Sequence, residues 1–228
     1  MGSGILDKES IDLINKTEGH VVQLGPIISI YTLPKDVFVK MKKIVKTVLN
    51  SDKSKKHNHK LAGRIDKEYV IPQEMLVEVE IYNYFIFVLY CYLRDCSLSM
   101  GTGQKHVFRS SLIITEMWVN EMHKNEYNPL HWHDMETTIS AVLYIKVPKM
   151  SQAKIEGKKD DLAGKLTLAH KSTSLNSLER PMISVDPREG EIILFPAHML
   201  HMVHPFTNNV KRISVSFNAK HKFKVGGK

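Results

Sequence analysis

The second half of the chain is a series of short strand-forming segments with little room for helices between them. After Gly101, runs rich in β-branched and aromatic residues alternate with turn residues. A parallel sheet would need a crossover of roughly a dozen residues or more between successive strands. The spacing therefore favours an antiparallel sandwich or jelly roll. The predicted strands are 112–120, 137–147, 165–169, 182–185, 191–196 and 212–218.

The first half of the chain predicts helices and one short strand that pack on this β-structure. Asp36 is a suitable cap for a helix that runs to about Leu49. Apolar residues at helical spacing predict a second helix from Glu74 to about Asp95. The predicted strand lies within 19–32. The fold class is therefore mainly β with packing helices.

Length and composition are typical of one globular domain. The chain has 228 residues, 43% of them hydrophobic and 25% charged, which suffices for a core without disulfides or structural metals. We expect 1–228 to be a single domain, in which an N-terminal helical and strand extension, 1–105, packs on a β-core at 106–220. The net charge of +8 comes mainly from scattered lysines, which are more typical of a solvated surface than of a nucleic-acid interface.

The cysteines and the apolar runs indicate the cellular compartment in which the protein is expected. Cys91 and Cys96 lie five residues apart in a predicted helix, face different directions, and are predicted to be reduced core residues. The longest apolar run, 82–93, is too short to span a bilayer, and no signal peptide is visible. We expect a cytoplasmic protein with no membrane partner, and we leave monomer and homodimer open.

Three histidines have the order and spacing of an open metal site. His131 and His133 would lie on the same side of a strand, and His201 follows a strand that ends at Pro196. Non-haem Fe(II) is usually held by two histidines and one carboxylate. The nearest carboxylate here, Asp134, would need a bulge to reach the histidine face. We predict His131, His133 and His201 as ligands, with Asp134 as the alternative that would complete the site in place of His133.

The remaining histidines are assigned no part in the metal site. His198 and His204 are expected around the site but not as ligands. The others are expected at the surface: His20, His57, His59, His106, His123, His170 and His221.

The segment that begins at Arg212 alternates strictly between polar and apolar residues. Arg212, Ser214, Ser216 and Asn218 share one face, which is either solvated or turned into the mouth of a barrel. In the second case Arg212 offers a planar fork of donors to a carboxylate, and Ser214 adds a hydroxyl. A turn at 204–210 would return the chain as a hairpin, so that Arg212 enters the cavity that holds His201. A ligand that chelates the metal and carries a distal carboxylate, such as 2-oxoglutarate, has the required shape.

Neighbouring strands supply further candidates for the same cavity. Tyr144 lies on the same face as Ser140 and is expected to donate to the same carboxylate, although a core role for this tyrosine is the alternative. The predicted lining residues are Trp118, Asn120, Ser140, Ser216 and Asn218. The polar segment 149–161 is predicted to be a loop, and whether it closes over the site as a lid is left open.

Residues Trp118 to Asn218 resemble the short 2-oxoglutarate/Fe(II)-dependent oxygenases of bacteria and phages. The shared motifs are His131-Trp132-His133, 139–144, 190–196, His201, Pro205 and 212–218. The resemblance implies a double-stranded β-helix (jelly roll, cupin-like), iron at its open end, and 2-oxoglutarate bound by Arg212 and Ser214. It also implies succinate and carbon dioxide as co-products. His133 departs from the family pattern, which has a carboxylate at this position.

These features predict a dioxygenase that hydroxylates a C–H bond, with Fe(II) as cofactor and 2-oxoglutarate and dioxygen as co-substrates. A peptide or protein substrate of the prolyl type is the first expectation for the primary substrate, and a small molecule remains open. A nucleobase substrate, as in an AlkB-like nucleic-acid oxygenase, is supported only by the basic surface. The alternatives from other classes are a cupin-like metal-binding protein that is no oxygenase, and an interaction protein whose histidines are incidental.

Overall fold

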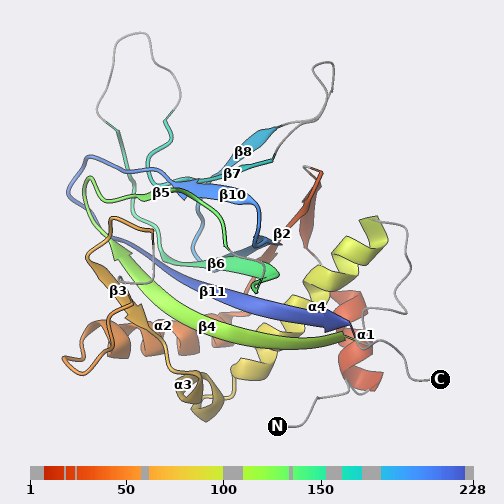
Figure 1. The fold of residues 1–228 in the computed structure, drawn as a ribbon. Helices are drawn as coiled ribbons and strands as arrows, with labels where there is room; N and C mark the ends of the chain where they lie inside the picture. Colours follow the sequence, from red (N-terminus) through yellow and green to blue (C-terminus); the bar gives the residue numbers. More distant parts are fainter. Residues whose placement is uncertain are drawn as a thin grey trace.

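Two antiparallel sheets face each other and form the body of the protein (Figure 1). The computed structural model describes residues 8–17, 19–23, 25–57, 62–99, 110–133, 136–152, 161–170 and 181–223. The larger sheet has seven strands in the order β1-β2-β9-β6-β11-β4-β3, and the smaller has four in the order β5-β10-β7-β8. The mainly-β class with packing helices is therefore confirmed.

The strands of both sheets are short except for two neighbouring strands of the larger sheet. Those two are β4 (Ser110–Met122) and β11 (Arg212–Phe223), which pair along their whole length with a bulge between Asn218 and Ala219. The others in the larger sheet are β1 (His20–Gln23), β2 (Ile27–Thr32), β3 (Lys67–Val70), β6 (Ile139–Lys146) and β9 (Glu191–Pro196). The smaller sheet contains β5 (Asn128–His131), β7 (Leu166–Ala169), β8 (Met182–Val185) and β10 (Leu200–Val203).

The helices cover the outer face of the larger sheet, on the side away from the smaller sheet (Figure 1). They are α1 (Lys8–Lys16), α2 (Lys35–Leu49), α3 (Gln73–Glu78) and α4 (Tyr82–Ser99). One apolar cluster joins α2 and α4 to the outward residues of β11, such as Val215 and Phe217. In the part of the chain that the structure describes, none of these helices combines the length and apolarity needed to cross a bilayer.

A second apolar cluster fills part of the space between the two sheets. Its members come from inward positions of both sheets, including Ile193 and Phe195 from β9 and Leu166 and Leu168 from β7. Because successive side chains of a strand alternate between faces, the apolar residues of β11 face the helices. Its polar residues therefore face the smaller sheet.

Several sequence-based boundaries were wrong for local reasons. The predicted strand within 19–32 is a hairpin of β1 and β2 around Gly25, whose φ of 78° suits a glycine turn. Helix α2 follows Pro34 and has no side-chain cap, so Asp36 lies in its first turn instead of capping it. The predicted helix 74–95 is split into α3 and α4 near Glu80, which has a positive φ of 60°.

The contact between α4 and the outer face of the larger sheet should dominate stability. Phe85 and Phe217 are fully buried, and their ring centroids lie 5.7 Å apart in an edge-to-face arrangement. We expect Phe85→Ala to lower the free energy of unfolding by about 3–5 kcal/mol, because it removes burial and leaves a cavity. Chemical denaturation would measure this. The control Leu98→Ala, at a position 56% exposed on the same helix, should change stability by about 0.5 kcal/mol or less; equal effects of the two variants would contradict this packing.

Candidate metal and co-substrate site

Three histidines converge at one end of the space between the sheets. His131 is the last residue of β5 and pairs in register with His201 of β10. His133 follows two residues later, and its backbone N–H donates to the carbonyl of Ala197 at 3.0 Å. The ring centroids lie 4.1 Å (His131–His201), 5.2 Å (His133–His201) and 5.5 Å (His131–His133) apart. One ligand nitrogen from each ring lies within 4.8 Å of the others, which is compatible with a single metal ion.

Local hydrogen bonds orient two of these rings for ligation. Nδ1 of His131 lies 2.7 Å from the carbonyl of Pro129, and Nδ1 of His201 lies 2.8 Å from the carbonyl of Met199. A carbonyl only accepts, so Nδ1 carries the proton in both rings and Nε2 presents its lone pair. Burial lowers the pKa of both imidazoles, to about 3 for His201, where neighbouring His131 adds to the effect. Both rings are therefore neutral at physiological pH, as metal ligation requires.

The histidine pair is not built as the sequence pattern suggested. We expected His131 and His133 to lie on one strand, but β5 ends at His131, and His133 belongs to the loop beyond it. Trp132, between them, is 63% exposed. The alternative ligand Asp134 lies outside the described residues. Of the two further histidines expected near the site, His198 is exposed, and Nε2 of His204 lies 2.7 Å from the hydroxyl of Thr167.

Arg212 reaches the histidines from the opposite sheet. We expected a hairpin between the strands of His201 and Arg212, and this was wrong: β10 pairs with β5 and β7, whereas β11 pairs with β4 and β6. The two residues therefore face each other across the sandwich. Arg212 is 1% exposed, and burial lowers the pKa of its guanidinium, which nevertheless stays charged because arginine does not deprotonate in proteins.

The guanidinium of Arg212 is only partly satisfied. Its Nη1 donates to Ser214 Oγ at 3.1 Å, and the group lies over the ring of Tyr144 at 5.0 Å. Nε and Nη2 have no hydrogen-bond partner, and neither has the buried hydroxyl of Tyr144. Nε and Nη2 form one edge of the guanidinium, so the empty positions are the two parallel donors that bind a carboxylate bidentately. Buried donors without partners are costly, and an acidic ligand would remove this cost.

A cavity joins the histidines to Arg212. All five predicted lining residues, Trp118, Asn120, Ser140, Ser216 and Asn218, contribute to its wall, as do Arg212 and Ser214. Tyr144 lies behind Arg212 and does not line the cavity. Hydrogen bonds fix the polar wall: Trp118 Nε1 donates to Asn120 Oδ1 (3.1 Å), and Asn120 Nδ2 donates to Ser216 Oγ (3.2 Å). We call this cavity the cup.

The sequence did not reveal some residues around the cup. Ile65 and Asn128 line it but belong to irregular or very short segments that no periodicity marks. His57, which we expected at the surface, is 4% exposed, and its ring centroid lies 5.3 Å from that of Trp118. These contacts join residues far apart in the chain, so local patterns carry no signal for them.

The beginning of the predicted loop 149–161 is anchored beside the cup. Ser151 N–H donates to Asn208 Oδ1 at 2.9 Å, and Thr207 N–H donates to the Ser151 carbonyl at 2.8 Å. Gly164, with a φ of 66°, lies so close to the side chain of Met150 that a Cβ at this position would clash with it. Residues 153–160 of the predicted loop lie outside the described residues.

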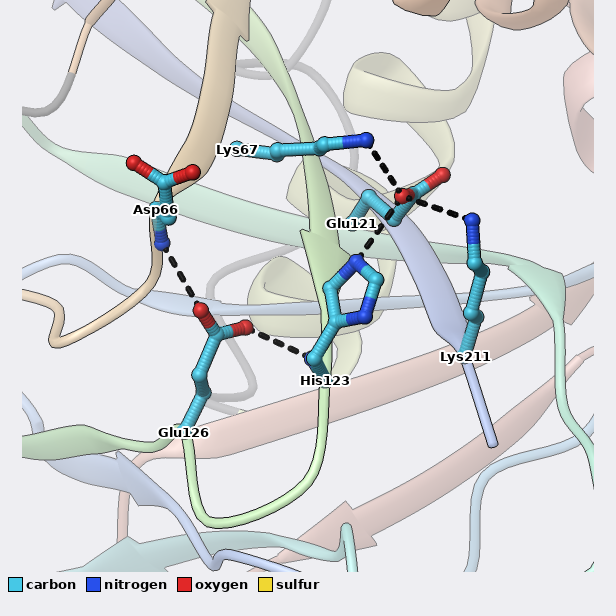
Figure 2. A network of polar contacts seen from close by, with 6 residues as sticks. All are labelled: Asp66, Lys67, Glu121, His123, Glu126 and Lys211. Atoms are coloured by element: carbon cyan, nitrogen blue, oxygen red, sulfur yellow. Dashed lines mark hydrogen bonds and ion pairs between the residues drawn. The ribbon is translucent and has the colours of Figure 1, made fainter. Parts of the chain in front are cut away.

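A polar network on the outer side of the larger sheet supports the strands that form the cup. A single oxygen of the nearly buried Glu121 contacts Lys67 (3.1 Å), His123 (2.9 Å) and Lys211 (3.2 Å). The neighbouring Glu126 accepts from two backbone N–H groups, of Asp66 at 3.0 Å and of His123 at 2.6 Å. Figure 2 shows how these six residues join β3, β4, the turn after β4 and the residue before β11. Ile65, Asn120 and Arg212, which line the cup, directly adjoin members of this network.

Comparison with known proteins agrees with this geometry. Residues 116–218, slightly less than half of the chain, match a family model described as "Putative 2OG-Fe(II) oxygenase". A prolyl hydroxylase from Trichoplax adhaerens, solved with a peptide fragment of hypoxia inducible factor, is 12% identical over 92% of this chain and 86% of that chain, with a TM-score of 0.50. The non-heme alpha ketoglutarate dependent carbocyclase SnoK from nogalamycin biosynthesis is 11% identical over 100% and 91%, also with a TM-score of 0.50. No curated protein matches the sequence.

The family match confirms the resemblance inferred from the motifs, and it indicates a 2-oxoglutarate/Fe(II)-dependent oxygenase. At 11–12% identity the solved structures establish a shared fold, and the double-stranded β-helix expected from the resemblance is thereby confirmed. Fe(II) is the metal of this family, and 2-oxoglutarate and dioxygen are its co-substrates.

The network around Glu121 should make stability depend on pH. Burial alone would raise the pKa of Glu121, but His123, Lys67 and Lys211 outweigh burial and hold the pKa below 4.5. A carboxyl whose folded pKa is depressed stabilises the fold above its unfolded pKa, and this contribution is lost as pH falls through the folded pKa. We expect Glu121→Gln to lower the free energy of unfolding by about 1 kcal/mol at neutral pH. The difference from the parent should disappear in acid. Urea unfolding as a function of pH would measure this, with the exposed Glu136→Gln as control; a difference that persists in acid would contradict the role of the charge.

Proposed function

We propose that this chain hydroxylates a C–H bond of a peptide or protein side chain, consuming 2-oxoglutarate and dioxygen at an Fe(II) ion. One observation carries the proposal. Three imidazoles that can share a metal face, across one cavity, a buried arginine whose carboxylate-binding edge has no partner. A metal-binding protein that is no oxygenase needs the imidazoles but has no use for the unsatisfied arginine.

The side chains divide the work of holding the metal and the co-substrate. His131, His133 and His201 would hold Fe(II), with Nε2 as the donor of His131 and His201. Nε and Nη2 of Arg212 would bind the distal carboxylate of 2-oxoglutarate, and the ring of Tyr144 would hold the guanidinium from behind. Fe(II), when bound, supplies the activation of dioxygen. The protein orients the co-substrate and shields the reaction from water.

The choice of metal ligands also determines the net charge at the metal site. Three neutral imidazoles leave the full charge of Fe(II) uncompensated, whereas a set with one carboxylate would remove one unit. The dianionic co-substrate would then supply the balancing charge. Asp134 remains the alternative third ligand, and a structure of the full chain with Fe(II) and a 2-oxoglutarate analogue would identify the ligand set.

Exposed apolar side chains beside the strand of His131 favour a polypeptide substrate. Tyr127, Leu130 and Trp132 are exposed by 37%, 54% and 63%, and they lie in and beside the strand that carries His131. Exposed apolar groups around a reaction centre are typical of an interaction surface. A prolyl residue is the first side chain to test. We also propose a cytoplasmic location, because Cys91, which is buried, and Cys96, which is partly buried, are both free thiols.

Replacing Arg212 should separate an oxygenase from a plain metal-binding protein. We expect Arg212→Gln to weaken 2-oxoglutarate binding by about 100-fold, because it removes a bidentate, charge-assisted pair in a buried site. Titration of the metal-loaded chain with 2-oxoglutarate, followed by succinate formation, would measure this. The control Arg188→Gln removes an arginine that is 74% exposed and should leave both quantities unchanged. Equal 2-oxoglutarate affinity in Arg212→Gln and the parent would refute the assignment.

Replacing His201 should remove the metal instead. We expect His201→Ala to weaken Fe(II) or Co(II) binding by about 100-fold or more and to abolish succinate formation, since it deletes one of three ligands. The Co(II) spectrum and its titration provide the measurement. As control, His170→Ala changes a histidine that directly follows β7 and is not among the converging residues. Stoichiometric metal in His201→Ala would rule out this ligand set.

A further inference from the structure

A second cavity lies beside the cup and has no part in the chemistry proposed above. It has a volume of about 290 Å³ and is formed by the segment before β3, the start of α3 and the middle of β4. Leu76, Ile114 and Met117 give it an apolar side, and Lys55, Gln73 and Glu116 give it a polar side. This size and mixture are typical of small-ligand sites.

The wall between the second cavity and the cup is one pair of side chains thick. The ring of His57, which lines the second cavity, lies 5.3 Å from that of Trp118, which lines the cup. Asn218 Nδ2, on the cup side, donates to Glu116 Oε1 on the other side at 2.8 Å. Glu116 Oε2 in turn lies 3.3 Å from His57 Nε2. The lining of one cavity therefore contacts the lining of the other through these pairs of side chains.

Glu116 lies in a row of side chains that runs across the larger sheet to the histidines. It pairs in register with Asn218 of β11, Asn218 pairs with Ser140 of β6, and Ser140 pairs with Phe195 of β9. Ser140 Oγ donates to Asn218 Oδ1 at 2.9 Å, and the Phe195 ring lies 5.0 Å from His201. Glu116 is thus level with the metal-binding end of the cup, two strands away from Ser140.

Glu116 is also the only carboxylate among the described residues that line either cavity. The other charged groups there are cationic, namely Arg212 and Lys55, and a bound metal would add positive charge. The side chain of Glu116 is 35% exposed, so it is within reach of a ligand in the second cavity. Among the described residues that line the two cavities, it is therefore the one that offers a complementary charge to a cationic hydrogen-bond donor.

We propose that the second cavity binds a basic group of the primary substrate, an ammonium or guanidinium, and that Glu116 is the residue that selects it. The inference rests on the proposed function, since it assumes that the cup holds the reacting C–H bond. The substrate would lie across Trp118 and Asn218, with its reacting carbon in the cup and its basic side chain in the second cavity. The cationic N–H groups would take the place of His57 at Glu116 Oε2, while Asn218 keeps its bond to Oε1.

Binding of matched probes to the full, metal-free chain tests this cavity directly. The probes are N-acetyl-lysine methylamide and N-acetyl-norleucine methylamide, which differ by the ammonium group alone. For a ligand of this size we expect a Kd of about 1 mM for the lysine probe, with NMR shifts at Gln73, Thr115 and Glu116. The norleucine probe should bind about tenfold more weakly or worse, because it lacks the charge-assisted bond.

Two variants separate the role of the charge from an effect on folding. Glu116→Gln keeps an acceptor for Asn218 but loses the charge, and it should weaken the lysine probe about tenfold without changing the weak norleucine binding. Glu189→Gln removes a carboxylate of similar exposure, 43%, that pairs with Lys42 on another part of the surface. It should bind both probes as the parent does.

The outcomes decide the proposal independently of the oxygenase assignment. Equal binding of the two probes, shifts confined to other parts of the chain, no binding at tens of millimolar, or no effect of Glu116→Gln would each overturn it. If the lysine probe binds as expected but the Fe(II)-loaded parent forms no succinate from 2-oxoglutarate, the second cavity stands and the proposed function fails. If succinate forms but neither probe binds, the oxygenase assignment stands and the proposed role of the second cavity fails.

Discussion

The unsatisfied guanidinium of Arg212 is the constraint around which the interior of this protein is arranged. A fully buried cation with two N–H donors that lack acceptors is destabilising. Other contacts must therefore hold the guanidinium in place. Ser214 accepts one N–H, and the ring of Tyr144 lies under the group. The fold thus keeps a binding site ready at a cost in stability, which an acidic ligand would offset.

The rest of the fold offsets the cost of burying Arg212, because the two faces of the larger sheet have different functions. The outward residues of β11 pack against α4 in an apolar cluster that includes Phe85 and Phe217. The inward residues of the same strand can therefore be polar without depriving the protein of a core. The ion network around Glu121 adds a second support at the end of the sheet where Arg212 begins β11. Stability and ligand binding are thus carried by opposite faces of the same strands.

The sequence predicted what depends on local alternation and missed what depends on long-range placement. Strand periodicity put Arg212, Ser214, Ser216 and Asn218 on one face, and the structure turns that face into the cup. Nothing in the local pattern specified that β10 and β11 lie in different sheets, because a turn of the same length also suits a hairpin. The burial of His57 against Trp118 and the nearness of Glu116 to Asn218 arise from contacts between distant segments. Their residue types are unremarkable in the sequence.

The distribution of charge around the cup links these observations. Neutral imidazoles, a buried arginine and a bound cation would make the reaction centre strongly positive, which favours a dianionic co-substrate and disfavours any further cation. A single carboxylate at the boundary with the second cavity changes that preference locally, because its partly exposed charge acts strongly on a direct partner and is screened by solvent at longer distances. The co-substrate and the primary substrate can then be distinguished by the sign of their charge. The net charge of +8 for the whole chain has no part in this discrimination, since it lies mainly on scattered lysines that salt screens.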